Sequence, residues 1–275
     1  MDLAAASGED LAGVSDIVTD AMTAFGLSAD GTTKIIKDGF TKEVSNASHF
    51  ADVLAAASAN SNTNVAMSGE SFKYAAPVAG SLGYSVEDTA IALGLMASSG
   101  LKSSMAGSSL RTILTNLAKP TDDISDAMDY LGISLQNGDG SMKSLMDIVT
   151  DLRGAFGQCK MPMDQFQENL AKLDEKYANG ELTEKKYNEA LADLTEKAYG
   201  AEGALKAKYA ATLAGKEGMS GLLSIVSAAP EDFDKLTNAI YNSDGAAKEM
   251  AEIKMDNLQH DVVKLQSAME GLGIT

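Results

Sequence analysis

The sequence has no tryptophan, a single cysteine and only four prolines in 275 residues. Cys159 cannot form an internal disulfide, which fits a reducing compartment or indifference to redox conditions. Few prolines allow long uninterrupted helices. Aromatic residues make up only 5% of the chain, so Ala, Met, Leu and Gly must fill the interior. Because these are mostly small side chains, we expect helices that approach closely but gain little burial per residue.

Basic residues are also scarce, with 22 Lys and Arg against 39 Asp and Glu and a net charge of −17. A surface for DNA needs clustered Lys and Arg, and no such cluster is visible. An anionic membrane is disfavoured for the same reason. The uncharged runs Tyr74–Val86 and Thr89–Leu101 are 13 residues each, too short to span a bilayer as helices. We therefore expect no nucleic-acid surface and no membrane-spanning segment, and Met1–Leu3 does not begin a signal peptide.

Residue patterns typical of catalysis or metal binding are missing. The two histidines, His49 and His260, lie far apart without cysteine or histidine at ligand spacing. No Gly-x-Ser-x-Gly elbow marks a nucleophile. The carboxylate pairs Asp122–Asp123 and Glu231–Asp232 stand at helix starts, where the helix dipole explains them. We expect no catalytic, cofactor-binding or metal-binding residues, no cofactor and no enzymatic activity.

One segment is similar to a phosphate-binding loop. Gly215–Glu217 carries the Gly-Lys pair, but Ala210 replaces the first glycine and Glu217 replaces the Ser or Thr that would hold magnesium. We interpret Gly215, Gly218 and Gly221 instead as positions of close helix packing.

A second segment has the beginning of a calcium-binding loop. Asn137, Asp139 and Ser141 have the required spacing, but Met142 and Ile148 stand where the pattern needs Gly and Glu. A plain turn is the better interpretation.

The chain is organised around Phe50–Leu117, where the pattern predicts three successive apolar helices. Pro77 should kink the second of them. Ser85 predicts the helix cap of the third. Residues Ala90–Ala97 are apolar on nearly every side, so we expect them at the buried centre.

Helical periodicity extends over most of the remaining chain. It predicts a helix over Leu11–Phe25, a short connecting helix over Ile35–Ser45, and a final helix over Gly245–Gly271. The segment around Ile133–Gly140 predicts a small β-hairpin or loop. Further helices are predicted around Ile124–Leu131, Leu145–Phe156, Met219–Val226 and from Pro230 onward.

A Glu- and Lys-rich region from Met163 onward carries two matching apolar stripes joined by a turn at Gly180. Together the stripes predict an antiparallel αα-hairpin with solvated charged faces. Their residues are Phe166, Leu170, Leu173 and Tyr177, then Tyr187, Leu191, Leu194 and Ala198.

Fourteen methionines offer two interpretations. They could fill the core or form an adaptable binding surface, and core filling is the simpler. Met96, Met105, Met219 and Met250 are among them.

Several long segments, in order, resemble the shared N-terminal region of phage tail tape measure proteins. They are Phe50–Val65, Phe72–Gly100, Ala106–Thr121, Leu131–Phe156 and Ala210–Ile240. Combined with the periodicity, the resemblance leads us to expect an all-α, multi-helix bundle with a projecting αα-hairpin. We divide it into a helical tape-measure core region (1–157), an inserted charged hairpin (158–208) and C-terminal helices completing the core (209–275).

The resemblance implies a structural role. Such a protein sets tail length during assembly and occupies the tail lumen after time in the host cytoplasm, with tail tube and assembly chaperone proteins as partners. We also expect self-association, and a chain that is part of a longer product. The alternatives are a helical scaffold that recruits a protein through the hairpin and a hydrolase-associated module.

Overall fold

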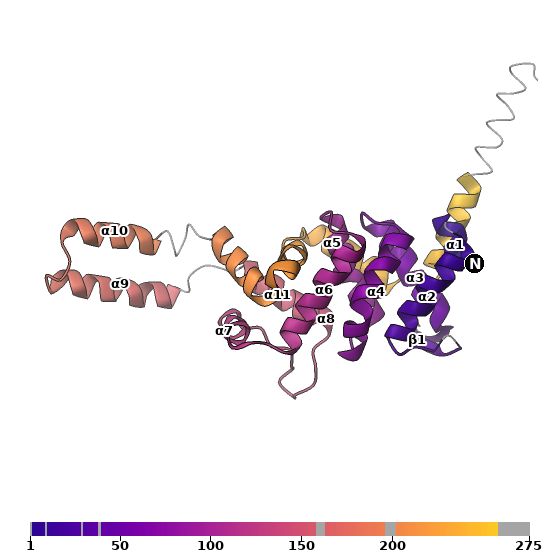
Figure 1. Cartoon of the computed structure of the whole chain (residues 1–275), viewed down its shortest axis with the longest axis horizontal. Helices are drawn as coiled ribbons and strands as arrows, with labels where there is room; N and C mark the ends of the chain where they lie inside the picture. The colour runs from indigo at the N-terminus through magenta and orange to yellow at the C-terminus, as the bar shows by residue number, and fades with distance from the viewer. Residues whose placement is uncertain are drawn as a thin grey trace, which may run out of the picture.

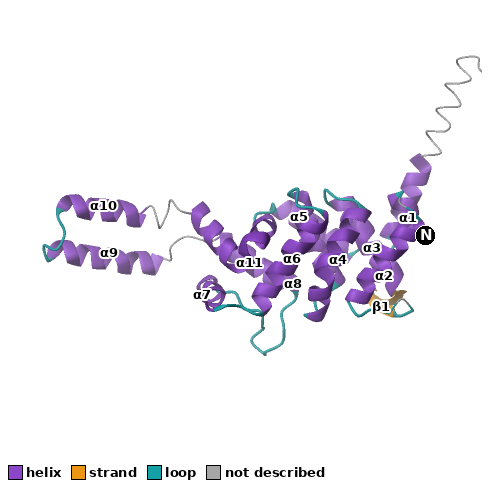
Figure 2. Cartoon of the chain, viewed as in Figure 1, coloured by secondary structure: helices purple, strands orange, loops and turns teal. Residues whose placement is uncertain are grey.

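The computed structural model describes residues 2–8, 10–28, 30–37, 40–157, 163–195 and 202–257. Helices dominate, and the described strands form one two-stranded sheet (Figures 1 and 2). The expected all-α, multi-helix class is therefore confirmed. The elements are α1 (Asp2–Ser7), α2 (Leu11–Ala24), β1 (Thr32–Lys37), β2 (Phe40–Ser45), α3 (Asn46–Asn60), α4 (Val65–Ser81), α5 (Val86–Ser98), α6 (Ser103–Ala118), α7 (Asp122–Leu131), α8 (Leu145–Gly157), α9 (Met163–Ala178), α10 (Glu184–Thr195), α11 (Glu202–Val226) and α12 (Pro230–Tyr241).

Helix α5 is the buried centre of the body, as its composition predicts. The Ser85 hydroxyl accepts a hydrogen bond from the Asp88 backbone N–H and caps the helix start. Every residue from Ala90 to Ala97 is buried. With Ile91 and Met96 fully enclosed, this helix contributes apolar surface in all directions.

Small residues set the spacing between the surrounding helices. A Cβ added at Gly107 of α6 would collide with the Ser71 carbonyl oxygen of α4. At Gly80, near the end of α4, an added Cβ would lie 2.6 Å from the Ala24 carbonyl oxygen. Close approach of backbones therefore replaces large interdigitating side chains at these contacts. Pro77 lies inside α4, which continues to Ser81, with its ring exposed.

Helix α11 packs across α6 through two of the glycines singled out in the sequence. An added Cβ at Gly221 would lie 2.8 Å from the Ser109 Cβ, and one at Gly218 would lie 3.1 Å from Ile113. The close-packing interpretation is confirmed at both positions. Gly215 differs, because it interrupts α11 with φ 65° and ψ −179°.

The predicted connecting helix at residues 35–45 is wrong. Strands β1 and β2 form an antiparallel hairpin there, with Thr32 opposite Ser45 and Lys37 opposite Phe40. β-Branched side chains crowd a helix but fit a pleated strand, and Thr32, Thr33 and Ile35 favour the strand. Lys34, Lys37 and Lys42 are interspersed among the apolar residues in a way that also suits an amphipathic helix, and this led to the wrong interpretation.

The small hairpin or loop predicted around residues 133–140 is present. One isolated antiparallel bridge joins Gln136 and Met142. Asp139 accepts hydrogen bonds from the backbone N–H and the hydroxyl of Ser141 at 2.9 Å and 2.6 Å. These bonds lower the pKa of Asp139. They stabilise the turn itself, in line with the plain-turn interpretation.

The αα-hairpin is also present. Helices α9 and α10 contact each other, with the Tyr177 and Tyr187 rings 4.7 Å apart and the Tyr187 hydroxyl donating to Asp174 at 2.6 Å. Gly180 has φ 74° in the turn. Figure 1 shows the pair extending away from the helical body. Between residues 168 and 191 no side chain is buried.

Some expectations fall outside the described residues. These are Cys159, Ala198, the part of the final helix beyond residue 257 with His260, and the side chains of Phe166 and Leu194. The described part of that last helix covers residues 246–257. Helix α11 runs through residue 208, where the sequence suggested a boundary, and the three-region division remains a prediction.

Candidate functional site

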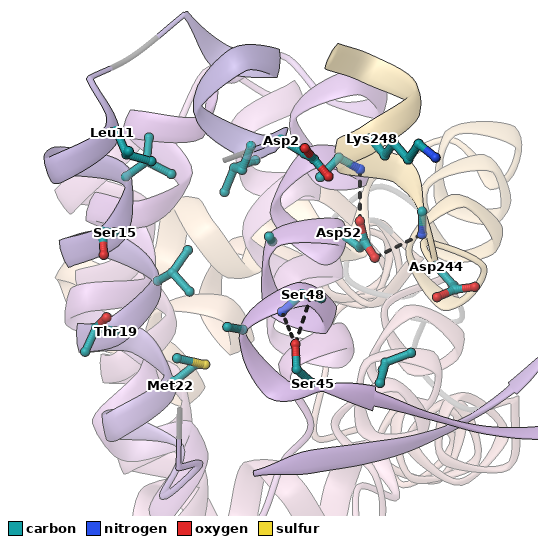
Figure 3. A pocket seen from close by; sticks show the side chains of 18 of the residues that line it. Asp2, Leu11, Ser15, Thr19, Met22, Ser45, Ser48, Asp52, Asp244 and Lys248 are labelled. Carbon is teal, nitrogen blue, oxygen red and sulfur yellow. Dashed lines mark hydrogen bonds between the residues drawn. The ribbon is translucent and has the colours of Figure 1, made fainter. Parts of the chain in front are cut away.

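A cleft of about 710 Å³ opens at the end of the body that holds the N-terminal helices (Figure 3). Its walls come from α1, α2, β2 and α3, with residues 244–248 closing one side. The cleft therefore joins segments from both ends of the described chain.

The α2 wall is apolar at its base, and its exposed rim carries both apolar and polar side chains. Val14, Val18 and Met22 are buried and recur at helical spacing, as the sequence predicted. Leu11, at the start of the same stripe, is 50% exposed. Ser15 also lines the cleft from this helix.

The opposite wall contains a buried carboxylate, Asp52 of α3. Its two oxygens accept hydrogen bonds from the backbone N–H groups of Gly245 at 2.9 Å and Ala247 at 3.0 Å (Figure 3). These N–H groups belong to the start of the helical segment 246–257, where helical donors lack partners of their own. Asp52 thus caps this helix from a distant part of the chain.

A second contact, at the surface, holds the chain just before the same helical segment. The Lys42 ammonium of β2 donates to both carboxylate oxygens of Asp244, at 3.1 Å and 3.0 Å. The Lys42 side chain is 54% exposed and that of Asp244 only 14%. The β-hairpin missed by the helical interpretation therefore supplies one of the links between the two ends of the chain.

An ion pair lies on the side of α3 near Asp52. The Nε2 atom of buried His49 is 2.8 Å from a Glu87 carboxylate oxygen of α5. This hydrogen bond raises the pKa of His49, assisted by the charges of Asp52 and Asp244 and opposed by burial. Burial acts to raise the pKa of Glu87, yet the bonds from His49 and from the backbone N–H of Glu87 together lower it.

Asp88, the next residue of α5, links two further elements. It accepts a 2.5 Å hydrogen bond from the Tyr241 hydroxyl at the end of α12 and a 3.3 Å bond from the Met146 backbone N–H of α8. Burial, followed by the bond to Asp88, raises the pKa of Tyr241 far above its ordinary range. Asp88 is therefore occupied in joining helices.

Taken together, these acidic groups anchor helices. The acceptors Asp52, Glu87 and Asp88 face backbone N–H groups, an imidazole and a phenol. In the described ranges no three or more His, Cys, Asp or Glu side chains gather as a metal site. The arrangement can fix the segment from Tyr241 onward against α3 and α5, and it supplies no nucleophile beside a base.

Sequence reasoning missed these anchors. It named only Ser85 at the start of the helix that holds Glu87 and Asp88, and it gave no role to Asp52 within the apolar run Phe50–Ala57. A lone carboxylate within an otherwise apolar run is a signal of a buried, partnered charge, and it could have identified Asp52 as buried.

The methionines divide between the two interpretations. Met96 is fully buried and Met219 and Met250 are partly buried, whereas Met105 is 64% exposed. Core filling therefore accounts for the first three better than for Met105.

Comparison with known proteins identifies the family to which the chain belongs. The model of a family described as phage-related minor tail protein matches residues 1–173. The chain belongs to this family. It is a phage tail protein, and the resemblance found in the sequence is confirmed by relatives named as tape measure proteins.

Two curated relatives show how far the similarity extends. The tape measure protein of Pneumococcus phage Dp-1 is 35% identical over 274 residues, which is 100% of this chain and 19% of that protein. The probable tape measure protein of Escherichia phage P2 is 26% identical over 239 residues, 86% of this chain and 24% of that protein. The chain thus spans about a fifth to a quarter of the length of these relatives.

No solved structure matches. Among the described helices, none combines the length and apolar character needed to cross a membrane.

Proposed function

We propose that this chain is a structural, non-enzymatic segment of a tape measure protein that helps set tail length and occupies the tail lumen. The observation that carries the proposal is the 35% identity to the Dp-1 tape measure protein along the whole chain. The mostly helical fold supports it, because a helical polypeptide converts residue number into length at about 1.5 Å per residue.

The charge of the chain fits this location. With a net charge of −17 it repels DNA that shares the same tube. During assembly the chain is in the host cytoplasm, with tail tube and assembly chaperone proteins as its partners. Tight binding to duplex DNA at moderate salt in a filter assay would contradict the charge argument.

Tail length tests the ruler directly. Deleting residues 163–195, which hold α9 and α10, removes 33 residues without cutting α11. If the segment is extended in the tail, electron micrographs of the deletion phage should show tails shorter by about 50 Å. Unchanged length would defeat the ruler role for this segment.

A variant of unchanged length serves as the control. Tyr177→Ala with Tyr187→Ala removes the ring contact between α9 and α10 but no residue. Its tails should have wild-type length, because the ruler counts residues rather than contacts. Equal shortening in both phages would instead indicate a defect in assembly.

The second candidate is a helical scaffold that recruits a protein through the α9–α10 hairpin. The observation in its favour is that the apolar stripe of the hairpin lacks buried residues from 168 to 191, with Tyr177 43% exposed. Purified tail tube protein should then bind the wild-type chain more tightly than Tyr177→Ala, with Lys185→Ala as the charged-face control. Equal affinities for all three proteins would remove this candidate.

We also propose self-association of the chain, since helices with Ala- and Met-rich faces gain burial from further copies. Sedimentation equilibrium at tens of micromolar should show species above the 28.6 kDa monomer. A strictly monomeric mass would contradict it.

Hydrolysis of peptidoglycan by the purified chain would overturn the non-enzymatic assignment and favour a hydrolase-associated module.

A further inference from the structure

Helix α11 changes direction at Gly215. The backbone there has φ 65° and ψ −179°, a region that is essentially open only to glycine. Residues on both sides are helical, and an added Cβ would meet nothing closer than the Asn116 side-chain nitrogen at 3.6 Å. The obstacle to another residue at this position is therefore backbone conformation rather than lack of space.

The kink is held by two polar side chains of α6. The Asn116 amide donates to the Leu213 carbonyl oxygen at 3.1 Å, on one side of Gly215. On the other side, the Ser109 hydroxyl donates to the Glu217 carbonyl oxygen at 2.8 Å. Both contacts come from α6, so this helix holds the two sides of the kink, while α7 and α8 also contact α11.

The residue pattern of α11 is equally suited to a straight helix. At about 100° per residue, the buried positions of α11 fall within one half of the circumference when the helix is continued through Gly215. The buried positions before and after Gly215 therefore share one half of a straight helix, so both forms are amphipathic. The buried positions are Ala210, Leu213, Ala214, Gly218, Gly221, Leu222 and Ile225.

We propose that Gly215 is a conformational switch point between two forms of α11. In the first, the helix is kinked and docked on α6 through Asn116, Ser109 and the close contacts at Gly218 and Gly221. In the second, which forms when α6 withdraws, residues 202–226 make one straight amphipathic helix about 37 Å long. The inference does not depend on the proposed role in the tail.

The test measures a distance across the kink in the full-length chain. Spin labels at Lys208→Cys and Ser224→Cys, in a Cys159→Ser background, lie on opposite sides of Gly215. A straight helix separates these backbone positions by about 24 Å along its axis. Double electron–electron resonance should show a different, kinked distribution for the parent protein.

The deciding variant is Gly215→Ala. Alanine favours the ordinary helix and is strained in the kinked conformation, so the ratio of straight to kinked molecules should rise at least about tenfold. The matched control is Gly154→Ala in α8, an ordinary helical glycine with open space around it. This control should leave the distribution unchanged.

A second variant keeps the test decisive if Gly215→Ala unfolds, as judged by circular dichroism. Ser109→Ala with Asn116→Ala removes both contacts from α6 and leaves glycine in place, and it should raise the population at the straight-helix distance. The proposal is overturned by a parent protein that is already straight, or by folded variants that retain the kinked distribution. A control that shifts as much as Gly215→Ala also overturns it.

Discussion

The buried ion pair between His49 and Glu87 makes stability depend on pH. His49 has a raised pKa in the folded chain, so its contribution is complete below its ordinary pKa of 6.5 and is lost as the pH rises through the folded value. Glu87 has a lowered pKa, so its contribution is present above its ordinary pKa of 4.5 and is lost as the pH falls through the folded value. The pair therefore stabilises the fold most between these two ordinary values.

This leads to a measurable difference between two proteins. Urea unfolding of the wild type should show stability falling as the pH rises from 6.5 through the raised pKa of His49, where the imidazole loses its proton. In His49→Gln the same interval should show a weaker decline, because glutamine does not titrate. Parallel profiles for the two proteins would show that His49 does not carry the dependence.

Leu93 tests the placement of the core. It is 5% exposed in α5, so Leu93→Asp leaves an unpaired charge in an apolar site and should destabilise the chain by roughly 4 kcal/mol or more. Lys185→Asp, at a side chain that is 86% exposed in α10, should change stability by less than about 0.5 kcal/mol. Thermal unfolding followed by circular dichroism measures both, and equal losses would mean that α5 is not the centre of the core.

Among the helices, the segment 246–257 depends on a cap that it does not itself supply. Asp52→Ala removes the acceptor for both backbone N–H groups and should cost about 1–2 kcal/mol. Hydrogen exchange should show faster exchange of the amides of residues 246–251. If those amides keep wild-type protection, Asp52 does not hold the helix.

The control for this prediction is another aspartate cap. Asp10 accepts from the backbone N–H groups of Ala12 at 3.2 Å and Gly13 at 2.9 Å at the start of α2, and these bonds lower its pKa. Asp10→Ala should loosen the first turn of α2 and leave the exchange of residues 246–251 unchanged. The comparison separates the loss of a local cap from the loss of one that joins distant parts of the chain.

The elements differ in how well the sequence predicts them, for identifiable reasons. Helix α5 is apolar all round and has a Ser85 cap, so local pattern and burial agree. In the β1–β2 hairpin, Asp38-Gly39 between β-branched runs is the strand signal, but the intervening lysines also allow a helical interpretation. The partners of Asp52 could not be predicted, because residues 245 and 247 are almost 200 positions away from it in the sequence.

For the molecule as a whole, the hairpin and the helical body should be energetically separate. Helices α9 and α10 contact each other, and Figure 1 shows them outside the body. Deleting residues 163–195 should therefore leave the free energy of unfolding of the remaining chain, measured in urea, unchanged within about 0.5 kcal/mol. A large loss would show that the body uses the hairpin for its own stability.

The close contacts between small residues have a mechanical consequence. Where Gly107 of α6 lies against the backbone of α4, attraction depends on atoms at van der Waals distance rather than on long interlocking side chains. Such attraction loses a quarter to a half of its strength over a gap of roughly 0.5–1 Å. Under a pulling force, this interface should behave as a brittle joint, which yields after a short displacement instead of stretching. Force applied along the chain would then separate its helices in abrupt steps.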